Sequence, residues 1–294
     1  MSNTIKAILL ILATMAVFTV LDATAKYLNQ SLPLVVTVFF RYAIALVIAL
    51  VLLLRRGGVS LLLTRHPALQ VSRGFFLLAS TFLNFFAMSY LQLAQTAAIS
   101  FTVPLWVCAL SVPLLGEKVG LRRWLAVLVG FCGVLIIMRP GSMDFHWAML
   151  VSLCSSLCAA CYNLATRKVG GKDAAETSLL YVCLVGSMAS APVAALSWQL
   201  PVGLQWLWLV MIGAAGAGGH LMLIEAHRKA TAATLAPFVY SQIIWMTMAG
   251  VVLFGQWPDA WTVIGALIVV ASGIYVFNRE RRRGVTTPAA VPED

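Results

Sequence analysis

The sequence has 294 residues, of which 61% are hydrophobic and 10% are charged, with a mean hydropathy of +0.93. Soluble globular domains are about 45–50% apolar and about 25% charged, so this composition excludes an ordinary soluble domain and indicates a membrane protein. The net charge of +10 does not indicate nucleic-acid binding, because the basic residues lie at the ends of apolar runs.

Ten apolar segments follow one another along the chain, and each approaches the roughly 20 residues that a membrane-spanning helix needs. The first is long enough to span the bilayer, and no cleavable signal peptide is apparent. The linkers are too short for a soluble domain, and the tail at 284–294 is expected to be disordered. We therefore predict an all-α membrane protein with ten transmembrane helices. The segments cover residues 5–28, 33–54, 72–92, 95–115, 121–138, 145–166, 177–197, 204–226, 231–253 and 260–278.

Basic residues between the segments predict the orientation. Loops on one side of the predicted membrane hold 17 of the 20 Lys and Arg residues, whereas the other side has only Lys26 and Arg139. Cytoplasmic loops carry an excess of Lys and Arg. We therefore predict a multi-pass protein of the bacterial inner membrane with cytoplasmic N- and C-termini.

A hairpin of two apolar segments occurs twice, from residue 94 to 133 and from residue 230 to 273. Each half of the chain holds five segments, an odd number, so the second half must enter the membrane in the opposite sense. We predict two inverted five-helix repeats, residues 1–138 and 139–278, followed by a basic cytoplasmic end and tail at 279–294. Each hairpin has a proline in its first helix and a glycine at its turn: Pro104 and Gly116, then Pro237 and Gly255.

These hairpins, together with Phe39-Phe40-Arg41-Tyr42 in the second segment, resemble the drug/metabolite transporter superfamily and its ten-helix EamA-type members. The resemblance covers residues 5–278, and it is greatest to bacterial exporters of aromatic and other neutral amino acids. It implies a cavity formed mainly by segments 1, 3, 4, 6, 8 and 9, with segments 5 and 10 at the periphery. The first turn has Glu117 where the second has Gln256, so a paired acidic turn is not implied.

Polar residues at membrane depth are candidates for a substrate site because they are costly there. Asn84 and His220 lie near the middle of the third and eighth segments, and they correspond in the repeat at a separation of 136. The glycine-rich run at 213–219 permits close helix packing or an open cavity wall beside His220. A histidine bonded between helices, a cavity lining and a proton-coupling group all remain open.

Aromatic and polar residues also gather around the two prolines. Each proline frees a backbone carbonyl, which is tolerated where a neighbour or a water-filled cavity satisfies it. Rings at this depth suit a flat, partly apolar substrate, although ordinary core packing explains any single one equally well. The predicted substrate-binding residues are Asn84, Trp106, His220, Tyr240, Gln242 and Trp245.

Asp22 and Arg41 lie about 9 and 12 Å below the outer ends of the first two segments, at ~1.5 Å per residue. Their similar depth predicts an ion pair with a structural role, or a direct role in substrate binding or gating. Lys26 is long enough to snorkel to the surface instead.

Other features narrow the function. Cys154, Cys158 and Cys161 share a helix face, but no His or carboxylate accompanies them on that helix, so we predict neither a metal site nor a cofactor. The first segment has no carboxylate at mid-depth, and no central Lys or Arg pair is present to hold phosphate. The expected substrate is therefore a neutral or zwitterionic small molecule.

We predict a secondary transporter that exports amino acids, including aromatic and other neutral ones, by alternating access. The alternative is an exporter of another neutral metabolite or drug. A membrane enzyme would need a catalytic cluster such as HExxH, which the sequence lacks, and a passive channel would not saturate. The expected partners are a small-molecule substrate and the lipid bilayer, with no nucleic acid and no indication of oligomeric state.

Overall fold

The computed structural model describes residues 3–56, 64, 66–116, 120–169, 173–230 and 232–282. Within these ranges, every regular element is an α-helix. The first hairpin's Glu117-Lys118 turn and the tail at 284–294 lie outside them, as do four of the basic loop residues counted above (Arg65, Lys118, Lys172 and Arg283). The helices are α1 (Asn3–Leu28), α2 (Leu34–Arg56), α3 (Pro67–Tyr90), α4 (Leu93–Ser100), α5 (Val103–Leu115), α6 (Leu121–Met138), α7 (Ala148–Val169), α8 (Ala175–Leu196), α9 (Gln205–Lys229), α10 (Ala232–Val239), α11 (Gln242–Phe254) and α12 (Ala260–Arg282).

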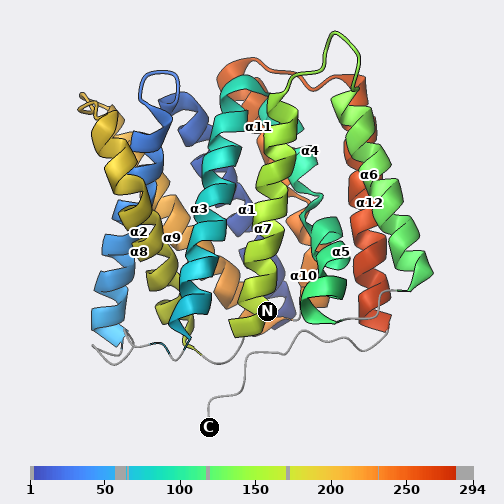
Figure 1. The fold of residues 1–294 in the computed structure, drawn as a ribbon, viewed down its shortest axis with the longest axis horizontal. Helices are drawn as coiled ribbons and strands as arrows, with labels where there is room; N and C mark the ends of the chain where they lie inside the picture. The colour runs from blue at the N-terminus through green and yellow to red at the C-terminus, as the bar shows by residue number, and fades with distance from the viewer. Residues whose placement is uncertain are drawn as a thin grey trace.

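These helices form ten spans, because α4 with α5 and α10 with α11 each make one interrupted span (Figure 1). Eight spans are long and apolar enough to cross a membrane, and α6 and α12 contribute the shorter apolar stretches Trp124–Met138 and Ala260–Val276. The predicted all-α, ten-span architecture is confirmed. We call the side where α1 begins and α12 ends the terminal face, and the opposite side the distal face.

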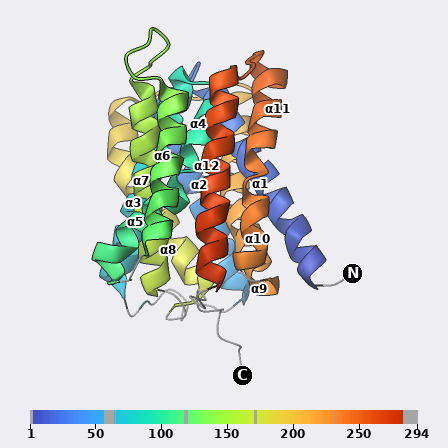
Figure 2. The same ribbon diagram turned by 90° about the vertical axis from the view of Figure 1, so that its right-hand side faces the viewer.

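Helix packing repeats between the two halves in inverted form. α1 packs along α9, which joins spans one and eight, and α3 packs along α7, which joins spans three and six. Equivalent helices also pack on each other, α2 on α8 at one end of the molecule and α6 on α12 at the other (Figures 1 and 2). Exchanging the halves maps the α1–α9 pair onto the α3–α7 pair and maps α2–α8 and α6–α12 each onto itself, as a two-fold axis in the membrane plane requires.

Both hairpin turns depend on glycine. Gly116 ends α5 with φ 69° and Gly255 ends α11 with φ 65°, both in the left-handed region. Each backbone N–H bonds back to the last turn of its helix, which is the common glycine C-cap. The predicted turn glycines are confirmed at both positions.

The α6–α12 pair packs backbone to backbone. A Cβ atom on Gly133 would lie 2.9 Å from the carbonyl oxygen of Gly265, and one on Gly265 would lie 2.6 Å from that of Gly133. Only glycine leaves room for this approach.

The two span interruptions are short and tight. Pro104 lies in the first turn of α5, where its missing N–H costs nothing, whereas Pro237 lies inside α10 shortly before the break. At the breaks, Thr102 and Ser241 bond three residues back, to the carbonyls of Ile99 and Phe238. Both spans are therefore locally tightened, as in a 3₁₀ turn, and not unwound.

Candidate functional site

The two breaks meet near the centre of the fold. The rings of Phe101 and Tyr240 lie edge to face with their centroids 4.9 Å apart. Tyr240 is buried among apolar residues of α4, α6, α7 and α12, and its hydroxyl lies against Gly273. Tyr240 therefore belongs to the core that joins the two hairpins.

A pair of buried polar atoms lies just beyond the second break. Ser241 Oγ and Trp245 Nε1 are one helical turn apart, so they share a face of α11, and neither has a hydrogen-bond partner among the described residues. Leaving such an atom unpaired costs about 1–3 kcal/mol. This face of α11 is therefore suited to a water molecule or a substrate.

Aromatic rings from α1 and α9 lie near the same place. Phe18 contacts His220 edge to face at 5.4 Å between centroids. Phe18 and Trp245 pack against one apolar cluster, which includes Met15 and Leu235. We define the central cluster as Phe18, His220, Ser241 and Trp245, contributed by three spans.

A second group of polar atoms lies between α3 and α7. Asn84 Oδ1 and Ser152 Oγ are buried, and within the described ranges neither has a hydrogen-bond partner. Ser155 Oγ donates to the carbonyl of Ser80 over 2.7 Å. Because α3 and α7 run antiparallel, this bond sets Asn84 and Ser152 at a similar height.

Trp106 is held in place by hydrogen bonds. Its Nε1 donates to Ser156 Oγ over 3.1 Å, and the Thr102 hydroxyl donates to the same oxygen over 2.8 Å. The ring edge packs on Phe131 at 4.6 Å between centroids. Trp106 thus ties the first break to α7. Gln242, at the start of α11, is partly buried, and its side chain makes no hydrogen bond to another described residue.

The predicted ion pair is not a direct contact. Asp22 and Arg41 are both buried, yet no salt bridge joins them in the described part of the chain. The Arg41 guanidinium lies over the Tyr42 ring at 4.5 Å from its centroid, with Nε unpartnered. Arg41 and His220 line a cavity of about 10 Å³, room for roughly one water molecule.

Lys26 does not snorkel to the surface. Its side chain is buried, and Nζ donates to the carbonyls of Met88 and Leu91 over 2.7 and 2.5 Å. It also lies 5.5 Å from the centroid of the Phe254 ring. The carbonyls at a helix C-terminus are partly negative and unpaired, so Lys26 joins α1 to the distal end of α3.

Another polar contact at the distal face links the end of α6 to the start of α12. Arg139 ends α6 and binds Asp259 at 2.5 Å and Asp144 at 2.9 Å. Partial burial acts to raise the pKa of the Asp259 carboxyl. Hydrogen bonds from Thr262 and the charge of Arg139 outweigh burial and hold that pKa below its ordinary value.

The two sides of the fold are closed to different degrees. On the distal side, α4 packs against α11. On the terminal side, the described residues of α5 and α10 do not pack together in this way. The interrupted spans therefore touch through their distal halves, whereas α5 and α10 lie apart toward the terminal face (Figure 2).

The sequence placed the predicted residues on the correct spans, but the structure divides them. His220 and Trp245 belong to the central cluster, and Asn84 lies on the α3–α7 side. Trp106 and Tyr240 instead stabilise the two span interruptions through contacts with neighbouring helices. Phe18 and Ser241 were not predicted as site residues. Their positions in the sequence could have indicated them: Phe18 lies at mid-depth in the first span, and Ser241 follows Tyr240 at the break.

Comparison with known proteins gives a consistent result. Two stretches, residues 5–139 and 146–278, match the EamA-like transporter family. A solved crystal structure covers 95% of this chain and 99% of its own, with a TM-score of 0.67 and 20% identity, which is a likeness of fold.

Three curated relatives cover nearly the whole chain. The S-adenosylmethionine uptake transporter of Rickettsia prowazekii is 26% identical and spans 89% of this chain and 88% of its own. The riboflavin transporter of Vibrio cholerae is 30% identical, with 90% and 91% covered. The pseudopaline exporter of Pseudomonas aeruginosa is 28% identical, with 90% and 94% covered.

Proposed function

Because this chain belongs to the EamA-like transporter family, we propose that it is a secondary transporter that exports amino acids, aromatic and other neutral ones, across the bacterial inner membrane. The observation that carries the substrate class is the pair of unpartnered atoms, Ser241 Oγ and Trp245 Nε1, beside the rings of Phe18 and His220. This combination offers polar contacts and an apolar surface within one cluster.

The chemistry of the central cluster suits a zwitterion with an apolar side chain. The Ser241 hydroxyl and the Trp245 N–H can both donate to a carboxylate. The rings of Phe18 and Trp245 offer an apolar contact surface for the rest of the molecule. Asn84 Oδ1 is an unpaired acceptor on the α3 side, suited to an ammonium group once the spans close around it.

Alternating access fits the packing of the interrupted spans. We propose that the state described here is closed at the distal face, through the α4–α11 contact and the Lys26 bonds to α3. With the predicted topology, the distal face is periplasmic, and the substrate enters from the cytoplasm. The halves, divided at residues 138 and 139, would then exchange conformations to open the distal face.

A second candidate is a larger metabolite that contains a flat ring. The relatives named for S-adenosylmethionine and riboflavin favour it. S-adenosylmethionine carries an amino acid group as well as a ring, so the same donors could serve it. One relative is named for uptake and another for export, so the direction of transport by this protein must be measured.

Counterflow in proteoliposomes separates these candidates. We expect saturable exchange of labelled tryptophan, phenylalanine and threonine, which unlabelled neutral amino acids inhibit. Saturable exchange of riboflavin or S-adenosylmethionine without amino acid exchange would favour the second candidate and reject the first. Flux that rises linearly with concentration would indicate a channel.

A matched set of variants ties transport to the central cluster. Ser241→Ala and Trp245→Phe each remove one unpartnered polar group, and we expect each to weaken amino acid exchange. Trp257→Phe, at a 73% exposed position near the distal face, is the control. If all three variants exchange amino acids equally well, Ser241 and Trp245 do not bind the substrate as proposed.

A further inference from the structure

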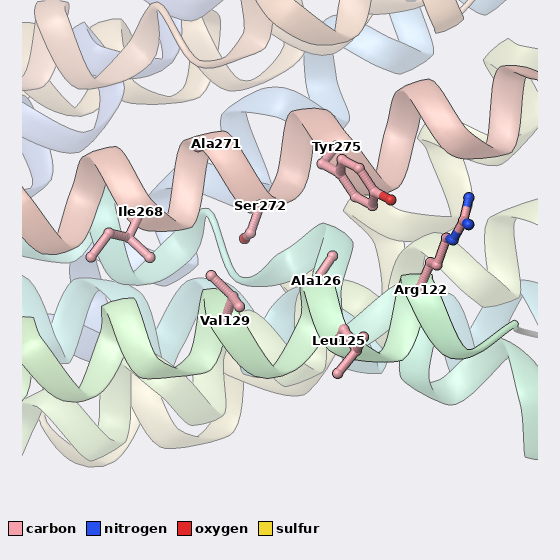
Figure 3. Close-up of a pocket in the computed structure, with 8 residues that line it drawn as sticks. All are labelled: Arg122, Leu125, Ala126, Val129, Ile268, Ala271, Ser272 and Tyr275. Carbon is pink, nitrogen blue, oxygen red and sulfur yellow. The ribbon is translucent and has the colours of Figure 1, made fainter.

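A groove runs between α6 and α12 on the outside of the fold, away from the central cluster. Its volume is about 440 Å³, within the range of small-ligand sites. The two helices lie side by side on one side of the molecule (Figure 2). The lining residues are Arg122, Leu125, Ala126, Val129, Ile268, Ala271, Ser272 and Tyr275 (Figure 3).

The groove exists because small residues face each other between large ones. Nearer the distal face the helices touch through Gly133 and Gly265, but the lower end of α6 splays away from α12 (Figure 1). There the facing residues Ala126, Ala271 and Ser272 are too small to fill the gap. The rim is formed by large side chains, among them Leu125 and Val129, both about half exposed.

One end of the groove is polar. The Arg122 guanidinium and the Tyr275 hydroxyl lie together at that end, while the other lining side chains are mainly apolar (Figure 3). Arg122 is the second residue of α6, a helix of 18 residues, which at ~1.5 Å per residue spans about 27 Å. That length is close to the ~30 Å hydrocarbon core, so Arg122 lies at the depth of the lipid headgroups.

We propose that this groove binds an anionic phospholipid. One acyl chain lies along the apolar floor between α6 and α12, and the phosphate accepts hydrogen bonds from Arg122 and Tyr275. Juxtamembrane basic residues attract anionic lipids, and α12 continues from Tyr275 into Arg279, Arg281 and Arg282 in the sequence.

A phospholipid fits this groove better than a second copy of the chain. A helix with its side chains is about 10–12 Å across, wider than a slot between two helices that pack on each other. Membrane helices associate through flat faces of small residues, whereas this rim is built from Leu125, Val129 and Tyr275.

Native mass spectrometry of the purified protein tests the proposal with two probes, phosphatidylglycerol and phosphatidylcholine with identical acyl chains. We expect the wild type to retain phosphatidylglycerol preferentially. Arg122→Gln should weaken phosphatidylglycerol binding about fivefold, the equivalent of ~1 kcal/mol for one basic residue, and leave phosphatidylcholine unchanged. Arg228→Gln, an exposed basic residue on α9, should change neither.

A second pair of variants tests the apolar part. Ala271→Phe fills the groove from α12 and should lower retention of both lipids, whereas Leu267→Phe, exposed on the same helix outside the groove, should not. Equal retention of the two lipids by the wild type would overturn the proposal. So would unchanged phosphatidylglycerol binding in folded Arg122→Gln and Ala271→Phe. A dimer lost in Ala271→Phe, with lipid retention unaffected, would assign the groove to a second copy instead.

Discussion

The Lys26 ammonium donates to the backbone carbonyl of Met88 over 2.7 Å and so ties α1 to the distal end of α3. Its second bond, to Leu91, uses another carbonyl at the same helix end. A buried lysine is costly unless its charge is compensated. Here the compensation comes from helix-end carbonyls, with no salt bridge to any described carboxylate.

Replacing Lys26 with Met tests this contact. The change keeps the length of the side chain but leaves the carbonyls of Met88 and Leu91 unpaired, which should destabilise the fold by about 1–3 kcal/mol. Thermal unfolding in detergent measures the effect. Lys6→Met, at an exposed position on the same helix, should unfold with the wild type. A Lys26→Met protein as stable as Lys6→Met would show that the bonds contribute nothing.

The orientation of the chain can be tested by cysteine labelling. After the six native cysteines are replaced, Asp144→Cys on the distal side should react with an impermeant reagent added to the periplasm. Lys6→Cys on the terminal side should react only after the membrane is opened. Asp144 and Lys6 are both exposed, so access to each depends on the side of the membrane. The reverse pattern would place the termini in the periplasm.

The distal Arg139–Asp259 pair should make stability depend on acid. Because the pKa of Asp259 is held below its ordinary value of 3.8, its charge stabilises the fold above that value, and the contribution is lost as pH falls through the lower folded pKa. Asp259→Asn removes the charge and keeps a good helix N-cap. Unfolding curves of the two proteins should differ at neutral pH and converge in acid, and a constant difference across pH would exclude the charge as its source.

The close approach of α6 and α12 predicts a difference between two glycines. Gly133→Ala forces a Cβ atom against the carbonyl of Gly265 and should destabilise the fold by about 1–3 kcal/mol. At Gly218, within α9, a Cβ atom would meet nothing within 4 Å. Gly218→Ala should therefore leave stability unchanged or raise it slightly, since alanine favours helix. If both variants unfold alike, the α6–α12 contact is looser than described.

The order of the helices could be predicted from the sequence because it depends on local features of the chain. Apolar runs set the spans, and Gly116 and Gly255 set the hairpin turns through their left-handed conformation. The separation of the two hairpins revealed the repeat. Each of these features depends on residues close together in the chain.

The contacts between helices were not readable in the same way. A rise of about 1.5 Å per residue gives the depth of a residue, but not the direction in which its side chain points. In a membrane the lipid-facing side of a helix is as apolar as the packed side, so the pattern that orients a soluble helix is weak. Hence Tyr240 was predicted on the correct span but lies in the core, and Lys26 was not expected to reach Met88, 62 residues away.

The final prediction separates a ring that binds substrate from a ring that supports the fold. Trp245 belongs to the central cluster and has an unpartnered Nε1, whereas Tyr240 packs on Phe101 within the core. Losing a stacking ring costs about 0.5–1.5 kcal/mol beyond area burial, roughly tenfold in affinity at the upper end. Trp245→Ala should therefore weaken the apparent affinity for tryptophan and phenylalanine more than that for threonine, as measured by counterflow in proteoliposomes. Tyr240→Ala should lower stability by about 3–5 kcal/mol and reduce the transport of all three equally.

The control for this comparison is Trp257→Ala, because Trp257 is largely exposed near the distal face. It should leave both the stability and the substrate preference unchanged. If folded Trp245→Ala protein transports all three substrates less well by the same factor, then Trp245 supports the helices as Tyr240 does. The aromatic preference would then have to come from another ring, and Phe18, packed on His220 at 5.4 Å, is the next one to replace.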